Sequence, residues 1–171
     1  MGLKVGTVKL ENYNTKWSEE FDKEKKCLEE LLGGRVLSIE HVGSTSIPGI
    51  KAKPIIDIMI VVKKLEEVEN FKHLFETELG YDFRDDKGKD NEYLVRKGST
   101  ENRTHLIHIV EVNSEKYFNF INFRNYLLNH KDYITKYEKL KEELALKYKD
   151  DRKSYTAAKN DFIKQVLNLC K

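Results

Sequence analysis

Apolar and polar positions follow patterns along the chain that predict helices and strands in turn. Over residues 15–32 the apolar positions recur at helical spacing, glutamate and lysine fill most of the gaps, and two glycines follow the last turn. We predict a helix there that is buried along one face. The apolar positions on that face are Trp17, Phe21, Leu28 and Leu31.

Two strands are predicted next. Residues 35–42 favour a strand with Leu37, Ile39 and His41 on one side. Residues 55–62 are apolar on both faces except at Asp57, a pattern typical of a central strand that helices cover on each side. The loop between the two strands, GSTSIPGIKAKP, holds both prolines of the chain.

The rest of the chain predicts an amphipathic helix, a strand start, a polar loop, a hairpin and a helical C-terminal half. The amphipathic helix is predicted over residues 64–79, and the strand begins at residues 81–83. The polar loop is the segment DDKGKDN, and the hairpin strands cover residues 92–96 and 104–111. From residue 114 onward three stretches have helical spacing. We therefore expect one domain over residues 1–171 of the α/β (α+β) class, with a mixed sheet of about four to five strands flanked by helices.

Composition narrows the classes of function. Of 171 residues, 35% are charged, and 31 basic against 29 acidic residues leave a net charge of +2. A charge so close to zero creates no broad field, so we expect neither nucleic acid nor a membrane as partner, and any anion site must be local. Cys27 and Cys170 form no CxxC pair, and no apolar signal segment is visible, so we expect a reducing, cytoplasmic location.

The densest chemical signal is the stretch IEHVGSTSIPGIKAKPIIDIMIVV, residues 39–62. Gly43 turns the chain after a strand, and glycine lets a phosphate approach the backbone closely. Lys53 adds positive charge. Hydroxyl and N–H groups for phosphate oxygens come from Ser44, Thr45 and Ser46. The alternative for this loop alone is a tight turn with a serine helix cap.

Asp57 strengthens the prediction of a site, because it lies in an otherwise apolar strand. An unpaired buried carboxylate costs several kcal/mol or becomes protonated, so a metal, a base or backbone donors must compensate it. The structural alternative is that Asp57 accepts N–H bonds from the preceding loop. In the later stretch RTHLIHIVE, His105 and His108 have opposite parity, so we expect one of them to face the site while the other packs or is exposed. Either histidine could equally be an ordinary core or surface residue.

These stretches, followed by FRNYLLNH and YTAAKNDFI, resemble the GrpB-like family over nearly the whole chain. The resemblance implies a nucleotidyltransferase fold related to the polymerase-beta type. Members of that superfamily carry a glycine-serine turn, two acidic residues one position apart on the next strand, and a further acid on a later strand. Their carboxylates hold two divalent metals during in-line transfer to a hydroxyl.

By this resemblance Gly43 and Ser44 match the turn, and Asp57 matches the first acid. Met59 occupies the second acidic position, and His108 takes the place of the later carboxylate. Neither is a hard oxygen ligand, and histidine prefers zinc, iron or similar ions. Glu40 or Glu111 would substitute if the fold brings either within reach.

The family's later blocks match Arg103, Arg124, Tyr155 and Lys159. A guanidinium and an ammonium group from the helical half would clamp a polyphosphate. The alternative is that Arg124 and Lys159 are ordinary surface charges on helices.

Three hypotheses follow for the function. The first is transfer of a nucleotidyl group from a nucleoside triphosphate to a hydroxyl. Asp57 and His108 would then be the catalytic and metal-binding residues, with Mg²⁺ or Mn²⁺, or else Zn²⁺, as cofactor. The second, which Met59 favours, is a catalytically degenerate module that binds a nucleotide or another phosphorylated small molecule. The third is a hydrolase or another transferase that uses a softer metal on the same two residues. The sequence predicts no oligomeric state.

Overall fold

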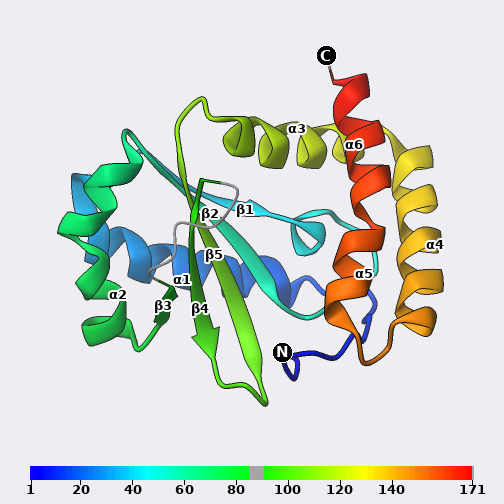
Figure 1. Cartoon of the computed structure of the whole chain (residues 1–171), viewed down its shortest axis with the longest axis horizontal. Coiled ribbons are helices and arrows are strands. Elements are labelled where there is room, and N and C mark those ends of the chain that lie inside the picture. Colours follow the sequence, from blue (N-terminus) through cyan, green and yellow to red (C-terminus); the bar gives the residue numbers. More distant parts are fainter. Residues whose placement is uncertain (85–90, 171) are drawn as a thin grey trace.

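A five-stranded mixed sheet lies at the centre of the computed structural model, which describes residues 1–84 and 91–170 (Figure 1). The strand order is β1-β2-β5-β4-β3, in which β2 and β5 run parallel and the other neighbours run antiparallel. The predicted mixed sheet and hairpin are confirmed, while the predicted loop DDKGKDN lies outside the described residues except for Asn91. The strands are β1 Ser38–Val42, β2 Ile56–Val62, β3 Asp82–Arg84, β4 Tyr93–Gly98 and β5 Arg103–Glu111.

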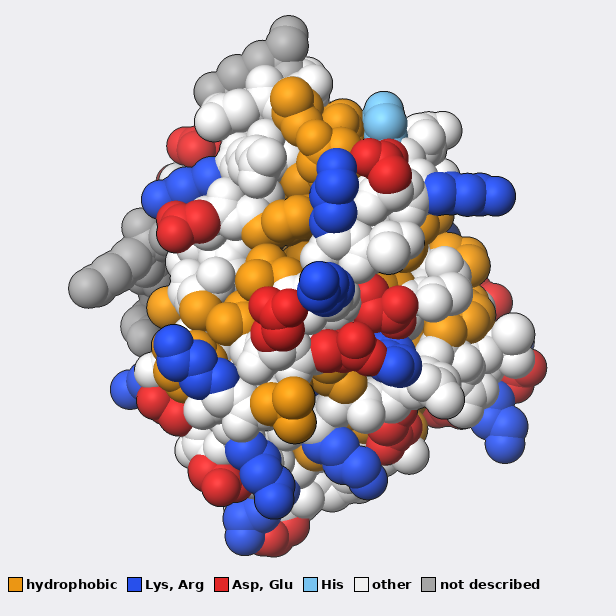
Figure 2. All heavy atoms as spheres, turned by 90° about the vertical axis from the view of Figure 1, so that its right-hand side faces the viewer, with side chains coloured by type: hydrophobic (Ala, Val, Ile, Leu, Met, Phe, Trp, Pro, Cys, Tyr) orange, Lys and Arg blue, Asp and Glu red, His pale blue; other side chains and the backbone are white. Residues whose placement is uncertain are grey.

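Helices cover both faces of the sheet. One face carries α1 (Lys16–Leu32) and α2 (Lys72–Leu79), and α3 (Glu115–Asn129) lies over the other. The remaining helices pack beside α3, at the right of Figure 1, and confirm the helical C-terminal half: α4 Lys131–Lys147, α5 Arg152–Ala158 and α6 Asn160–Leu169. Basic and acidic side chains are intermixed on their outer face (Figure 2). None of the helices in the described ranges has the length and hydrophobicity of a membrane-spanning segment.

Side chains alternate along β2, so that successive residues point toward opposite layers of helices. The isoleucines that point toward α1 and α2 are fully buried; they are Ile56, Ile58 and Ile60. Asp57 and Met59 therefore point toward the α3 face. Met59 pairs in register with His108 of β5, so His108 points the same way, and His105 points toward α1. The prediction that the two histidines face apart is confirmed.

Two predicted boundaries are wrong. The first strand begins at Ser38 rather than at residue 35, because Gly33–Arg35 extends the preceding helix by a 3-10 turn. The predicted helix over residues 64–79 is divided at Phe71, whose φ of -135° interrupts it, into the 3-10 helix Leu65–Asn70 and α2. The buried residues of this segment recur every third position, which suits the three residues per turn of a 3-10 helix. They are Leu65, Val68 and Phe71.

The loop between β1 and β2 is held against α4. The backbone N–H of Lys51 donates to Oε1 of Glu138 at 2.8 Å, and the Lys51 ammonium group pairs with Glu142. The ammonium group of Lys141 in turn donates to the Lys51 carbonyl oxygen. These contacts join residues far apart in the sequence, and they fix the helical half of the chain beside the end of the sheet that carries Asp57.

Candidate functional site

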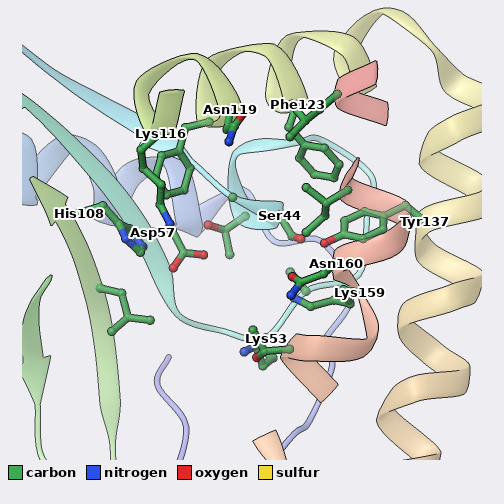
Figure 3. Close-up of a pocket in the computed structure, with 18 of the residues that line it drawn as sticks. Ser44, Lys53, Asp57, His108, Lys116, Asn119, Phe123, Tyr137, Lys159 and Asn160 are labelled. Atoms are coloured by element: carbon green, nitrogen blue, oxygen red, sulfur yellow. The ribbon is translucent and has the colours of Figure 1, made fainter. Parts of the chain in front are cut away.

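A cavity of about 880 Å³ lies between the α3 face of the sheet, the loop after β1 and the C-terminal helices. Figure 3 shows Asp57 near its centre, with His108 and Lys116 on one side and Ser44, Lys159 and Asn160 on the other. Both halves of the chain therefore contribute to one pocket. Of the residues predicted from the sequence, those that line it are Gly43, Ser44, Thr45, Lys53, Asp57, His108, Tyr155 and Lys159.

The loop after β1 supplies the Ser44 hydroxyl to the cavity. Gly43 turns the chain with a φ of 70°, and a 3-10 turn, Ser44–Ser46, follows. The Ser46 hydroxyl donates to the Gly43 carbonyl at 2.7 Å, and Thr45 Oγ1 lies 2.9 Å from Nε2 of His41. Among the described residues nothing pairs with the Ser44 hydroxyl, and Ser46 does not line the cavity. Of the three predicted hydroxyls, Ser44 is the one that remains available to a ligand.

Basic side chains from separate elements converge on the cavity. Lys53 comes from the loop, Lys141 from α4, Arg152 from α5, and Lys159 from the junction of α5 and α6. Burial first, and then the charges of Lys159 and Arg152, lower the pKa of Lys53 to about 7. Burial and the charge of Lys159 also lower the pKa of Lys141 to about 7. The cations are therefore held close enough to repel one another in the absence of an anion.

The ring of Tyr155 packs against two of these cations. Nζ of Lys53 lies 5.3 Å from its centroid, and Nζ of Lys159 lies 4.7 Å from it. Cation–π contacts of this kind position an ammonium group without neutralising its charge. Burial, with a smaller contribution from Tyr137, raises the pKa of Tyr155, so the phenol is neutral and acts as a scaffold.

Asp57 is the carboxylate that faces these cations. Its charge raises the pKa of Lys53 and of Arg152, against the larger lowering effect of burial. No group within the described ranges donates a hydrogen bond to the Asp57 carboxylate. The alternative in which N–H groups of the preceding loop satisfy it is therefore not observed.

His108 borders the cavity with one ring nitrogen already engaged. Its Nδ1 lies 2.8 Å from Oε2 of Glu92, whose other oxygen pairs with Lys116 at 3.2 Å. Burial raises the pKa of Glu92, but the hydrogen bond and charge of His108 and the charge of Lys116 outweigh it, and the net effect is a lowered pKa. An ionised Glu92 can only accept, so Nδ1 of His108 carries a proton, and in the neutral form of the ring Nε2 is then the acceptor.

Met59, at the second acidic position of the nucleotidyltransferase pattern, lies inside a hydrophobic cluster. Met59 is fully buried and packs with Val42, Val61 and Val110. Over residues 1–84 and 91–170, no group of three or more His, Cys, Asp or Glu side chains is placed to hold a metal. Two metals bound by protein carboxylates do not fit these residues, and zinc would lack the three protein ligands it usually has. A single Mg²⁺ or Mn²⁺ fits, because such ions bind through one or two carboxylates, water and ligand phosphates.

The predicted arginines do not line the cavity. Nη1 of Arg124 donates to the His41 carbonyl at 2.8 Å and pairs with Glu40 at 3.2 Å, which fastens α3 to β1. Arg103 is buried at the start of β5. Glu40 and Glu111 also lie outside the lining, so neither replaces the missing acid there.

Sequence reasoning missed several residues of the cavity. Lys141 follows Tyr137 by one helical turn and is 1% exposed, so it occupies the buried stripe of α4. A lysine within an apolar stripe is the signal that identifies such a residue. Arg152 lies in a charged segment and gives no such signal. The other lining residues that were missed include Lys116, Asn119, Phe120, Phe123 and Asn160.

Comparison with known proteins identifies the family. The family described as "GrpB protein" matches residues 7–169. "Glutamate-rich protein GrpB" of Alkalihalophilus pseudofirmus is 39% identical over 171 residues, 98% of this chain and 98% of that protein. "UPF0157 protein YqkA" of Bacillus subtilis is 36% identical over 92% of this chain, which spans 45% of that protein. The crystal structure of conserved protein GrpB from Enterococcus faecalis is similar with a TM-score of 0.86 at 34% identity, over 95% of this chain and 96% of that one. The chain belongs to the GrpB family.

Proposed function

We propose that this protein binds a nucleoside triphosphate, or another small molecule with linked phosphates, in the cavity around Asp57. The observation that carries the proposal is the convergence of Lys53, Arg152 and Lys159 beside this carboxylate. A polyphosphate would relieve the repulsion among these cations and favour the protonated lysines. The Ser44 hydroxyl would donate to a phosphate oxygen.

A divalent cation belongs to the proposal, because the Asp57 carboxylate and a polyphosphate would otherwise repel each other. Mg²⁺ or Mn²⁺ would be held by Asp57 and by phosphate oxygens, with water completing its shell. Lys53, Arg152 and Lys159 would then hold the remaining phosphate charge. This arrangement needs one protein carboxylate beside the basic cluster, and Asp57 would supply it.

Titration calorimetry with ATP, GTP, CTP and UTP, each in magnesium, in manganese and in EDTA, tests the proposal. Arg152→Met and Lys159→Met should each weaken binding about tenfold or more, as the loss of a charge-assisted hydrogen bond does. The exposed Lys153→Met, on the same helix as Arg152, is the matched control and should change affinity by less than about twofold. Asp57→Asn should remove the dependence on the metal. If neither the four nucleotides nor inorganic tripolyphosphate binds the wild-type protein with either metal, the proposal is overturned.

Nucleotidyl transfer is the second candidate function, and the arrangement of His108 favours it. With Nδ1 held by Glu92, Nε2 of His108 would accept the proton of an acceptor hydroxyl. The oxygen of that hydroxyl would bond to the α-phosphorus of the triphosphate, and pyrophosphate would leave. Pyrophosphate release from a bound triphosphate, with a small-molecule cell extract as the source of acceptors, measures the reaction. His108→Gln should abolish release and preserve binding. Binding without release in the wild-type protein would reject transfer in favour of the binding module.

A further inference from the structure

The cavity changes its chemical character along α3. Asn119, Phe120 and Phe123 lie three, four and seven residues after Lys116, so the four share one face of that helix, and all of them line the cavity. Ile163 of α6, which packs against α3, adds a further apolar side chain to the lining. The lining is therefore charged near Asp57 and aromatic and apolar farther along α3.

The two phenyl rings on this face are each held by a neighbouring ring. The Phe120 centroid lies 4.8 Å from that of His108, and Phe123 makes a T-shaped contact with Tyr137 at 5.3 Å. Both phenyl groups are only partly buried, so part of each remains open to the cavity. Figure 3 shows Asn119 and Phe123 extending from α3 toward the cavity. The Asn119 amide makes no side-chain hydrogen bond with any residue in the described ranges.

We infer that this face of α3 binds the planar ring of a nucleobase, so that the ligand is a nucleotide rather than a bare polyphosphate or a phosphorylated aliphatic chain. The inference rests on the proposed function and specifies its ligand class. Phenyl rings favour a flat aromatic partner, and the Asn119 amide presents a donor and an acceptor in one plane, as the edge of a nucleobase requires. An aliphatic chain would cover the rings but leave the amide dehydrated and unpaired.

Affinities for ATP and for inorganic tripolyphosphate, measured in the same magnesium buffer, test the inference. The wild-type protein should bind ATP about tenfold or more tightly than tripolyphosphate, because a base stacked on an aromatic side chain contributes about that much. Asn119→Ala and Phe123→Leu should each weaken ATP binding about tenfold and change tripolyphosphate binding by less than about twofold. Phe118→Leu is the matched control, since Phe118 is 44% exposed on α3 and does not line the cavity; it should change neither affinity.

The outcomes separate this inference from the proposed function. Equal affinities for the two ligands in the wild-type protein, or equal weakening of both by Asn119→Ala, would overturn the nucleobase site and keep the polyphosphate site. Binding of neither ligand would overturn both. Circular dichroism checks that each variant is folded, and Asn119→Ala decides the question alone if Phe123→Leu does not fold.

Discussion

Gly43 and Asp57 are in direct contact across the pair of strands β1 and β2. A Cβ atom on Gly43 would lie 2.5 Å from Oδ2 of Asp57 and 3.0 Å from its Cβ, and Gly43 adopts a φ of +70°. A hydrogen atom in place of a side chain therefore lets the carboxylate lie against the turn that supplies Ser44. The glycine of this motif therefore makes room for a protein group, the Asp57 carboxylate.

This contact predicts that Gly43→Ala destabilises the protein by about 2–4 kcal/mol, from about 1 kcal/mol of backbone strain and about 1–3 kcal/mol of overpacking. Gly49→Ala is a matched control, since Gly49 has a φ of +85° but a Cβ atom added there would meet nothing within 4 Å. It should lose only about 1 kcal/mol. Urea unfolding measures both values. Equal losses would contradict the contact, and in an Asp57→Ala background the excess at Gly43 should shrink.

The second prediction concerns the stability of variants at Met59. Met59→Asp places a carboxylate at the position that matches the second acid of the nucleotidyltransferase pattern, but that position lies in an apolar cluster. We expect a loss of about 3–5 kcal/mol of stability, as for an uncompensated buried charge. Met59→Leu should lose less than about 1.5 kcal/mol. Thermal unfolding with and without magnesium measures this, and recovery of the aspartate variant by magnesium would show instead that the position can hold a metal.

The lowered pKa of His41 predicts how the folding stability of the protein depends on pH. Burial, followed by the charges of Arg124 and His105, lowers the pKa of His41 from 6.5 to about 4. Between these pH values the unfolded chain binds a proton that the folded chain does not bind. Stability should therefore fall as the pH falls from 6.5 to 4, and this contribution should level off below pH 4. His41→Gln should flatten the fall in a series of urea unfolding curves, and an unchanged slope would contradict the assignment.

Lys53 and Lys141 predict proton uptake on ligand binding. Each has its pKa lowered from 10.5 to about 7, so both are largely uncharged in the free protein at about pH 8. A bound polyphosphate favours the ammonium form, so binding should take up protons, and affinity should fall as the pH rises above 7. Calorimetric enthalpies in buffers of different ionisation enthalpy measure the uptake, which Lys53→Met should reduce. Enthalpies that do not vary with the buffer would contradict this prediction.

Much of the fold was predictable because its patterns are local. The run around Asp57 is apolar on both faces, and that identifies a central strand whatever surrounds it. The prediction of one helix over residues 64–79 was wrong because Leu65, Val68 and Phe71 recur at a spacing of three, which fits a 3-10 helix as well as an α-helix. Boundaries set by packing cannot be predicted from spacing alone.

The site was predictable where it is contiguous in the sequence. Gly43, Ser44 and Asp57 lie on one loop and the strand after it, so their proximity follows from chain connectivity. The sequence shows that Arg124 is charged, but its partners, Glu40 and the His41 carbonyl, depend on how α3 docks on β1. The docking of the C-terminal helices also places Lys141 and Arg152 at the cavity. The apolar stripe of α4 indicates that Lys141 is buried, but it does not indicate which elements Lys141 faces.

The contacts between α4 and the β1–β2 loop have a consequence for the order in which the cavity forms during folding. The N-terminal half carries the carboxylate, and the C-terminal half carries most of the cations that face it. A chain whose last helices have not yet docked through Lys51 and Lys141 would hold Asp57 and Lys53 without Arg152 and Lys159. If the cavity binds a polyphosphate as proposed, affinity should develop only when these helices have docked, and the ligand should then protect the fully assembled chain from unfolding and proteolysis.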